Sequence, residues 1–577
     1  MSHYSEKSFN WKIAGKAGEG VMVAGKLLAK AAKKHGWQAF NYLEYPSLIK
    51  GAHQTAQVFA SEKSAKCQRK YLDLLINFNE NGFSKHKDEI TENTVIIYNS
   101  NSGELDLGKY PHIKDGQVFK LPLYDFAKET AGTTLATNSV SLGISAYFLG
   151  LDKQVFIDLL TSEFQKKGQG LVDKNVTALN KGYEQASWLR DPIVKQINKQ
   201  ADEMIVLNGN EAVGMGAVAA GIEFYSAYPM TPATGLLHYL ALAQNHYPIV
   251  VKHTEDEIGA INQAIGASVA GARSMTGTSG GGFALMAEGL SFAGVAEVPI
   301  VIHEAQRTGP ASGLPTWTAQ ADLQFVLYGG HGDFVRVVLT PGSVQEHFEL
   351  AMKAFYLAEK YQIPVFILSD KYILESHQTM PKPQDQYNIE KQSMLSDKDL
   401  KKTNDYLRYK ITENGISPRT IPGQENGLGL TNSYEHDEFG YATEEIDMTV
   451  AQVDKRARKL QALVSEVPEP FLYGPEEAEV TFVGWGSTIN VLEEVVNSGQ
   501  SSVNAIHIPC IMPLPVDKLK ELMSKAKKLV MVEGNQSGQA EKYITCSTGI
   551  QFADHIRRYD GRPFYVEDLI EYSKGGK

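Results

Sequence analysis

Residues 248–279, PIVVKHTEDEIGAINQAIGASVAGARSMTGTS, decide the fold. An apolar strand is predicted at the start of this stretch and a second one near its end, over RSMTGTS. Between them, EIGAINQAIGASVAGA is nearly uncharged and rich in Ala and Gly, which favours a buried helix. Strands that are apolar throughout and alternate with helices are typical of a mostly parallel sheet covered on both faces. The sequence therefore predicts an α/β protein.

The same alternation continues along the 577 residues, which are enough for several domains. Residues 1–190 open with a strand, a Gly-rich turn and a helix, the pattern of a βαβ unit, and a polar linker follows. We expect a second α/β domain over 204–375 and an arm, polar and rich in Pro and Gly, over 376–465. A smaller α/β domain is predicted over 466–577.

Composition and charge exclude several classes of protein. The formal net charge is −11 and no long Lys/Arg run occurs, which argues against a nucleic-acid partner. Cys67, Cys510 and Cys546 lie far apart and form no CxxC motif, so we assign no metal ligands, no iron–sulfur cluster and no disulfide framework to this chain. The first residues lack the apolar core of a signal peptide, and the longest uncharged stretch, 224–251, contains three prolines. We therefore expect a cytoplasmic protein without a membrane segment.

The turn GKAGEG follows the first predicted strand and carries Gly15, Gly18 and Gly20. Such glycines let backbone N–H groups approach an anion, and Lys16 adds positive charge. The spacing differs from the dinucleotide fingerprint G-x-G-x-x-G, so the motif indicates NAD only weakly. A phosphate-bearing ligand and a tight turn that merely packs the helix are both consistent with it.

Further polar segments follow the strands of the second domain. The loop Tyr228-Pro229-Met230-Thr231-Pro232 is stiffened by two prolines, which fix the direction of the Thr231 hydroxyl. Thr278 and Ser279 begin a Gly-rich connection that could cradle an anion, although it is no P-loop. Arg307 follows the strand PIVIHEA, where a guanidinium suits bidentate capture of a carboxylate. A rigid turn and a solvated surface arginine are the alternatives without a ligand.

Three carboxylates, Glu255, Asp256 and Glu257, open the small-residue helix. Negative charge at a helix N-terminus is favourable in itself and could explain all three. A carboxylate carried into the buried helix interface must instead find a partner or keep its proton, which is a property of catalytic acids. Because the four segments follow strands of one sheet, we expect them to converge on one cleft.

In this order, the segments resemble the α chain of the 2-oxoacid:ferredoxin oxidoreductases. YPMTPAT is similar to the family's Tyr-Pro-Ile-Thr-Pro loop, residues 255–282 to its Glu-x-x-Ala helix and Thr-Ser-x-Gly loop, and QRTGPASGLPT to the form in the 2-oxoglutarate-type members. The N-terminal part resembles the family's γ domain, here fused ahead of the α chain. FVGWGS and VMVEGNQSGQAEKY resemble its transketolase C-terminal-like α/β domain. The departures are Met230 in place of Ile, and Lys16, Ala17 and Glu19 in the Gly loop.

The resemblance implies thiamine diphosphate chemistry in a pyrimidine-binding-type parallel sheet domain. Glu257 would be the catalytic residue, hydrogen-bonded to N1′ of the aminopyrimidine, while Arg307 and Thr231 would bind the 2-oxoacid. Coenzyme A would accept the acyl group, with the Gly15–Gly20 loop as a possible anion or coenzyme A site. Electrons would pass singly to iron–sulfur clusters and ferredoxin. The remaining cofactor-binding positions would be Tyr228, Pro229, Thr278 and Ser279.

The chain lacks the Gly-Asp-Gly motif with which thiamine enzymes hold Mg²⁺ and the diphosphate; Gly332-Asp333-Phe334 is the nearest sequence. The resemblance therefore places Mg²⁺ and a [4Fe–4S] cluster on a β partner, in an (αβ)2 heterotetramer whose α subunit alone is inactive.

Several readings stay open. Conversion of 2-oxoglutarate to succinyl-CoA is favoured, with pyruvate, branched-chain 2-oxoacids and indolepyruvate as alternatives. The direction is open between oxidative decarboxylation and the reductive carboxylation used for CO2 fixation in a reductive TCA cycle. A non-catalytic assembly subunit and a nucleotide-binding oxidoreductase built on GKAGEG are rivals from other classes.

Overall fold

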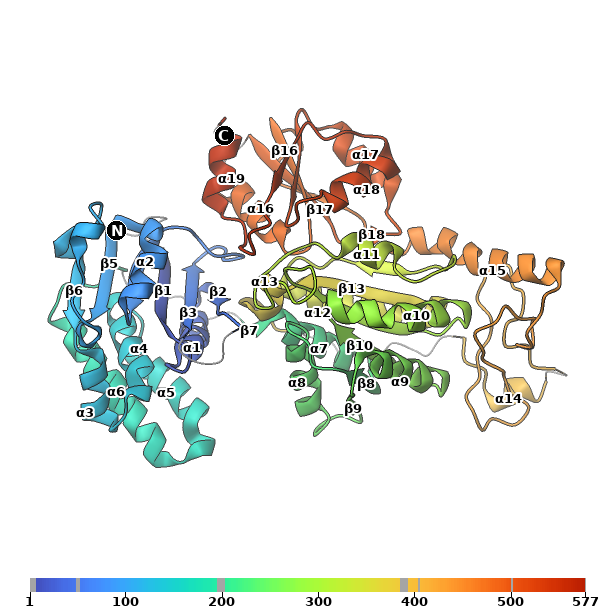
Figure 1. Cartoon of the computed structure of the whole chain (residues 1–577), viewed down its shortest axis with the longest axis horizontal. Coiled ribbons are helices and arrows are strands. Elements are labelled where there is room, and N and C mark those ends of the chain that lie inside the picture. The colour runs from blue at the N-terminus through green and yellow to red at the C-terminus, as the bar shows by residue number, and fades with distance from the viewer. Residues whose placement is uncertain are drawn as a thin grey trace. The chain divides into compact units, whose positions relative to one another are not determined.

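The computed structural model describes residues 7–47, 52–194, 203–383, 393–402, 405–499 and 502–575, which fall into two compact units. Unit 1 comprises residues 1–208, 375–383 and 564–577, and unit 2 comprises 209–374 and 384–563 (Figure 1). Most of the linker predicted after residue 190 lies outside the described residues. Both units mix helices with sheets that contain runs of parallel strands, so the predicted α/β class is confirmed.

Unit 1 is built on an eight-stranded sheet with the order β6-β5-β4-β1-β3-β2-β14-β7. The four strands from β6 to β1 are parallel, and the others pair antiparallel. The strands are β1 (Ser8–Lys16), β2 (Gln38–Glu44), β3 (His53–Ser61), β4 (Leu72–Asn77), β5 (Ile90–Asn99), β6 (Val118–Leu121), β7 (Met204–Asn208) and β14 (His377–Pro381). The helices are α1 (Val21–Lys34), α2 (Glu80–His86), α3 (Leu123–Ala131), α4 (Thr137–Phe148), α5 (Lys153–Phe164), α6 (Gln169–Ser187) and, near the end of the chain, α19 (Val566–Ser573).

The strand at 204–208, expected to open the second domain, lies instead in the first sheet, where β14 pairs with it and with β2. The local sequence indicates that these five residues form a strand, but it does not indicate which strand they pair with. The predicted domain boundaries themselves stay a prediction.

Unit 2 contains a seven-stranded sheet, β18-β12-β13-β11-β10-β8-β9, in which only β18 is antiparallel to its neighbour. A five-stranded sheet, β15-β17-β16-β19-β20, is parallel except for β15. The strands of the larger sheet are β8 (Phe224–Ala227), β9 (Val250–His253), β10 (Ser274–Thr278), β11 (Ile300–Gln306), β12 (Val337–Leu339), β13 (Pro364–Asp370) and β18 (Cys510–Met512). Those of the smaller sheet are β15 (Phe471–Tyr473), β16 (Val480–Trp485), β17 (Val503–Ile508), β19 (Leu529–Glu533) and β20 (Asp554–Arg557).

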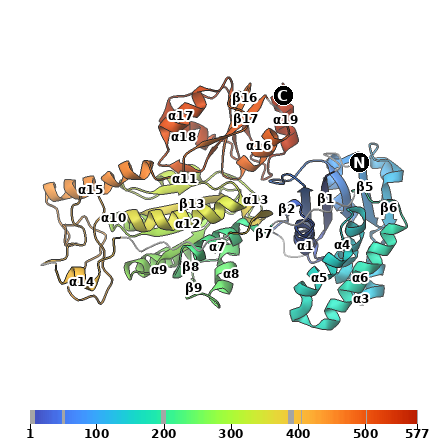
Figure 2. The same ribbon diagram turned by 180° about the vertical axis from the view of Figure 1, so that it is seen from behind.

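In unit 2, helices α9 and α10 pack closely because a glycine lies at their contact. In α9 and α10, a Cβ added at Gly289 would lie 2.8 Å from Ile261 Cγ2, so the two helices approach more closely than a larger residue permits. The helices are α7 (Gly209–Ala219), α8 (Thr234–Ala243), α9 (Glu257–Val269), α10 (Gly280–Val295), α11 (Leu323–Tyr328), α12 (Val344–Tyr361), α14 (Asp397–Leu400), α15 (Ile446–Val464), α16 (Thr488–Asn497), α17 (Val516–Ser524) and α18 (Gln539–Thr548), with α13 (Lys371–Glu375) leading back to unit 1. Of the predicted arm, His377–Pro381 forms β14 in unit 1; seen from either side, α14 and the irregular segment leading to α15 lie beyond one end of α9 and α10 (Figure 2).

Two further findings concern membrane-spanning helices and metal-binding side chains. Within the described part of the chain, no helix has both the length and the apolar character needed to cross a membrane. The three cysteines are free thiols, and the described His, Cys, Asp and Glu side chains form no group of three placed to hold a metal ion.

Candidate active site

The site lies where the parallel strands β8, β9, β10 and β11 end and their connections begin. The polar segments singled out in the sequence follow these strands, because carboxyl ends of parallel strands meet at one edge of a sheet. Of the carboxylates that open α9, Asp256 accepts a hydrogen bond from Gly259 N at 2.7 Å and caps the helix, whereas Glu255 is exposed. Helix capping therefore accounts for Asp256 and leaves Glu257 without that explanation.

Glu257 is turned into the protein, with 3 % of its surface exposed. Its Oε1 atom is buried and has no hydrogen-bond partner among the described residues. It packs against the first turn of α10, where a Cβ added at Gly282 would overlap both Glu257 Oε1 and Thr278 Oγ1. The glycine thus leaves room for two side chains that the sequence predicts to be functional. A buried carboxyl with a free oxygen is suited to hydrogen-bond a ligand that enters from outside.

Arg307 and the proline-rich loop are joined directly. The Arg307 Nη1 atom donates a hydrogen bond to Thr231 O at 2.9 Å, so the guanidinium and the Thr231 backbone lie side by side. Arg307 is half-buried, and burial lowers the pKa of its guanidinium, opposed by the negative charge of Asp322. The predicted convergence of Thr231 with Arg307 is thus present.

The other predicted cofactor positions differ in exposure. Thr278 and Ser279 are fully buried, and Ser279 Oγ has no partner among the described residues. Tyr228 is 39 % exposed, and its ring centroid lies 6.4 Å from that of His253, while Pro229 is half-buried. The loop therefore borders the site from its solvent side.

Two carboxyls that the sequence analysis missed, Glu304 and Asp322, flank the same helix turn. Glu304 on β11 pairs in register with Thr278, is fully buried, and has no partner for either oxygen among the described residues. Burial, and then the charge of Asp322, raises the pKa of Glu304 well above its usual range. Asp322 abuts Gly280, where a Cβ would lie 2.5 Å from Oδ2. Burial raises the pKa of Asp322 to about 6, although the charge of Arg307 lowers it.

The Gly-rich turn belongs to unit 1, whereas the residues described above belong to unit 2. Gly15 and Lys16 end β1, and Gly18 and Gly20 have positive φ angles of 99° and 75°. The chain's own Glu19 enters the loop: Lys16 N donates to Glu19 Oε2 at 2.6 Å, and Tyr124 OH donates to Glu19 Oε1 at 2.7 Å. A carboxylate there opposes a phosphate by charge. The anion or coenzyme A role of this loop stays a prediction.

The residues at the edge of the larger sheet fit thiamine diphosphate. The free Oε1 of Glu257 can take part in a hydrogen bond to a ring nitrogen, and Gly281, where an added Cβ meets no heavy atom within 4 Å, leaves open space beside the first turn of α10. Comparison with protein families agrees. Residues 215–455 match the family described as pyruvate flavodoxin/ferredoxin oxidoreductase, thiamine diphosphate-binding, and residues 10–185 match pyruvate ferredoxin/flavodoxin oxidoreductase. Fold and site thus define a thiamine diphosphate-binding oxidoreductase subunit.

Individual relatives narrow the family. The 2-oxoacid:ferredoxin oxidoreductase subunit alpha of Sulfolobus sp. is 31 % identical over 97 % of this chain and 96 % of its own. The 2-oxoglutarate synthase subunit KorA of Methanocaldococcus jannaschii is 33 % identical, over 57 % of this chain and 88 % of its own. A solved 2-oxoglutarate:ferredoxin oxidoreductase from Magnetococcus marinus, with 2-oxoglutarate, coenzyme A and succinyl-CoA bound, superposes with a TM-score of 0.91 at 32 % identity, covering 99 % of this chain and 100 % of that one. The chain belongs to the 2-oxoacid:ferredoxin oxidoreductase family, as an α subunit.

Proposed function

We propose that this α subunit serves a 2-oxoglutarate:ferredoxin oxidoreductase, which forms succinyl-CoA and CO2 from 2-oxoglutarate and coenzyme A and reduces two ferredoxins. The observation that carries the catalytic role is the buried Glu257 carboxyl, whose free Oε1 lies against Thr278 and Gly282. The QRTGPASGLPT loop and the likeness to the Magnetococcus enzyme, in which 2-oxoglutarate is bound, support this substrate over pyruvate.

In this proposal each residue has a separate task. Bound thiamine diphosphate supplies the electron sink for decarboxylation. Glu257 holds a proton at the ring nitrogen of the aminopyrimidine, and its burial keeps water from competing for that contact. We assign Thr278 and the adjacent Ser279 to the same cofactor site, because Thr278 Oγ1 and Glu257 Oε1 both lie beside Gly282.

Arg307 provides the positive charge for the C1 carboxylate of the 2-oxoacid. Its hydrogen bond to Thr231 O restricts the guanidinium to one orientation, so fewer rotamers are lost when the substrate binds. Thr231 then presents its hydroxyl to the same substrate. Tyr228 and Pro229 border the entrance.

A β subunit is expected to complete the site. Ile258, which follows Glu257 in the first turn of α9, and Leu285, in the second turn of α10, are each 50 % exposed. Exposed apolar side chains next to a site are typical of a surface that a partner covers. We propose that this partner carries Mg²⁺ and the [4Fe–4S] cluster, that the assembly is an (αβ)2 heterotetramer, and that it acts in the cytoplasm.

The test is the activity of the native complex, isolated anaerobically through a tag on this chain. Coenzyme A-dependent reduction of a low-potential viologen is compared with 2-oxoglutarate and with pyruvate. Strong reduction with 2-oxoglutarate alone supports the proposal. Preference for pyruvate would support the proposed reaction type but refute the proposed specificity for 2-oxoglutarate. Absence of activity with any 2-oxoacid, in a complex that retains an iron–sulfur partner, would refute it in favour of the assembly-subunit role.

A further inference from the structure

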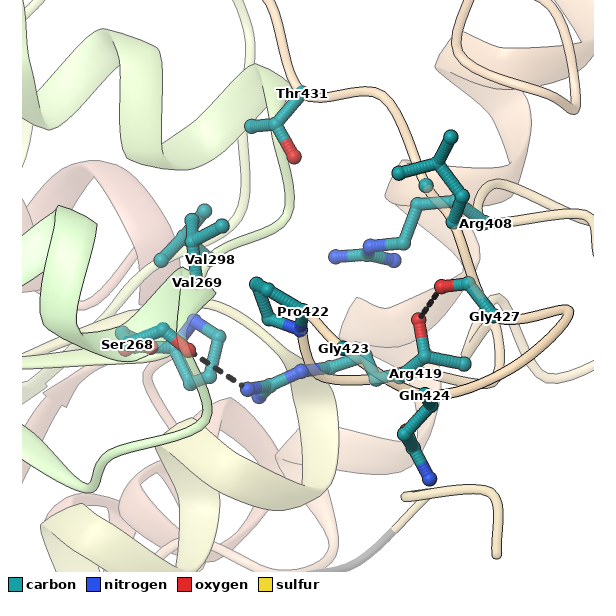
Figure 3. Close-up of a pocket in the computed structure, with 14 residues that line it drawn as sticks. Ser268, Val269, Val298, Arg408, Arg419, Pro422, Gly423, Gln424, Gly427 and Thr431 are labelled. Atoms are coloured by element: carbon teal, nitrogen blue, oxygen red, sulfur yellow. Dashed lines mark hydrogen bonds between the residues drawn. The ribbon is translucent and has the colours of Figure 1, made fainter. Parts of the chain in front are cut away.

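The arm holds buried cations against the carboxyl ends of α9 and α10. Arg408 Nη2 donates to Glu297 O at 2.9 Å and to Ala296 O at 3.3 Å, directly after α10. Arg419 Nη2 donates to Ser268 O, in the last turn of α9, at 3.1 Å (Figure 3). Carbonyls at a helix carboxyl end carry partial negative charge, so both contacts are favourable.

Two lysines of α15 enter the same region. Lys455 Nζ and Lys459 Nζ each lie 2.6 Å from one oxygen of the Glu297 carboxylate, and all three residues are fully or almost fully buried. Lys459 Nζ also donates to Gln362 O, after the end of α12, at 3.3 Å. Burial first, and then the charges of Lys459 and Arg408, lower the pKa of Lys455 to about 8 despite the attraction of Glu297.

The buried charges of this region do not balance. Four cations face two carboxylates, so the side chains carry an excess of two positive charges. The three helix ends supply about −0.5 charge each, which leaves about half a positive charge without compensation in a poorly solvated region. The groups counted are Arg408, Arg419, Lys455, Lys459, Glu297 and Glu359.

A cavity of about 110 Å³ opens beside these cations, between the end of α9 and the glycine-rich residues 420–431 (Figure 3). Arg408 and Arg419 both line it, with exposed fractions of 8 % and 4 %. No carboxylate occurs among the described residues of its wall. Arg419 Nη1 has no hydrogen-bond partner among the described residues, and Glu359 Oε2, at 3.6 Å, is too distant for one.

We propose that this cavity binds a small oxyanion of the phosphate or sulfate type between Arg408 and Arg419. The volume exceeds the roughly 30 Å³ share of one water, so several waters or one tetrahedral oxyanion can enter. Arg408 Nη1 also donates to Gln362 Oε1 at 3.2 Å, so Arg408 offers an anion its positive charge and its remaining N–H groups, and Arg419 offers the Nη1 atom that has no hydrogen-bond partner among the described residues. Gly423, with a φ of 98° and no heavy atom within 4 Å of an added Cβ, lets the wall approach the ligand with its backbone.

An anion in this place would contact two guanidinium groups of the arm and so tie the arm to the carboxyl ends of α9 and α10. The same chemistry is offered by free phosphate and by a phosphate group of coenzyme A. The two sources are separable, because only the second makes inorganic phosphate a competitor of coenzyme A. This inference does not depend on the substrate proposed above, since it concerns the opposite ends of the two helices.

The experiment titrates inorganic phosphate into the intact holoenzyme by calorimetry, at constant ionic strength maintained with potassium chloride. We expect saturable binding that Arg408→Met weakens at least about tenfold, because hydrogen bonds to a charged group are lost. Arg336→Met is the matched control. Arg336 is equally buried and donates to Val326 O and Gly329 O, but it does not line the cavity. It should leave phosphate binding unchanged.

A second variant keeps the test decisive if Arg408→Met folds poorly. Val269→Leu adds volume to the cavity wall without removing a charge and should also weaken phosphate binding. If phosphate raises the KM for coenzyme A in the wild type but not in Arg408→Met, the oxyanion that the cavity binds is a phosphate group of coenzyme A. If phosphate does not compete with coenzyme A, the cavity binds a free oxyanion. The proposal is overturned if phosphate does not bind, or if the wild type, Arg408→Met and Val269→Leu bind it equally.

Discussion

Replacing Gly282 by alanine tests whether the packing of Glu257 against α10 controls turnover. A Cβ at this position overlaps Thr278 Oγ1 and Glu257 Oε1 and lies 2.8 Å from Glu257 Cδ. Thr278 is fixed by its place in β10, whereas Glu257 has a longer side chain with more rotatable bonds. We therefore expect the Glu257 carboxyl to move.

Gly281→Ala is the matched control. An added Cβ at Gly281 meets no heavy atom within 4 Å, and both glycines belong to the first turn of α10. Any gain in helix propensity, up to about 1 kcal/mol, is therefore shared by the two variants and cancels in their difference. What remains is the overlap, and overpacking of a close-packed interior costs about 1–3 kcal/mol.

The expected catalytic effect is larger than the effect on stability. Displacement of a catalytic group by about 1 Å lowers the rate on the order of 100-fold. We expect Gly282→Ala to lose about this factor in kcat and about 1–3 kcal/mol in the free energy of unfolding relative to Gly281→Ala. Gly281→Ala should retain the wild-type rate.

The assay is viologen reduction with coenzyme A and 2-oxoglutarate, on complexes isolated anaerobically and checked for bound thiamine diphosphate. Thermal unfolding of the same preparations gives the difference in stability. Equal kcat values for the two variants, at equal cofactor content, would refute the reasoning. The contact between Glu257 and α10 would then have no bearing on catalysis.

Other outcomes follow from the same geometry. Glu257→Gln should lower kcat by about 10²–10⁴-fold with the cofactor still bound; near-normal turnover would instead support a structural role. Arg307→Met should raise the KM for the 2-oxoacid at least about tenfold, since a charge-assisted contact is lost, and an unchanged KM would contradict the assignment. Asp322 gains its charge as pH rises through about 6 and then offsets Arg307, so the KM should rise above that pH in the wild type and stay level in Asp322→Asn. Burial opposes ionisation of Glu346, but His507, 3.0 Å away, outweighs it and lowers the Glu346 pKa to about 2 from 4.5. This pair should contribute up to about 3 kcal/mol of stability, present above pH 4.5 and lost as pH falls towards 2, and Glu346→Gln should flatten that acid limb in thermal unfolding.

Much of the fold and part of the site were predictable from the sequence. The fold class was predictable, because apolar strands that alternate with small-residue helices form few structures other than a buried parallel sheet. That these segments lie near one another was predictable, because each follows a strand of one parallel sheet; which pairs meet, Thr231 with Arg307 and Glu257 with Thr278, is seen only in the structure. The roles of these residues stay predictions.

Glu304 and Asp322 were missed for a physical reason. Glu304 is one charged residue inside an apolar strand, a signal visible in PIVIHEA, but its significance depends on its register with Thr278. Register is a property of strand pairing and not of local composition. Asp322 lies close to Gly280 through a loop whose path no periodicity encodes.

The contribution of β14 to the first sheet has a consequence for biosynthesis. Residues 7–194 leave the ribosome first, yet the sheet of unit 1 needs His377–Pro381 between β2 and β7. It also needs the last residues of the chain, because Gln68 Nε2 donates to Phe564 O and Lys70 pairs with Asp568, both at 2.8 Å. Until β14 has been synthesised, the backbone groups on one edge of β2 are unpaired and can pair with another chain. The unit that is synthesised first is therefore the last to be completed, so a nascent chain stalled before residue 377 should need a chaperone to keep that edge covered.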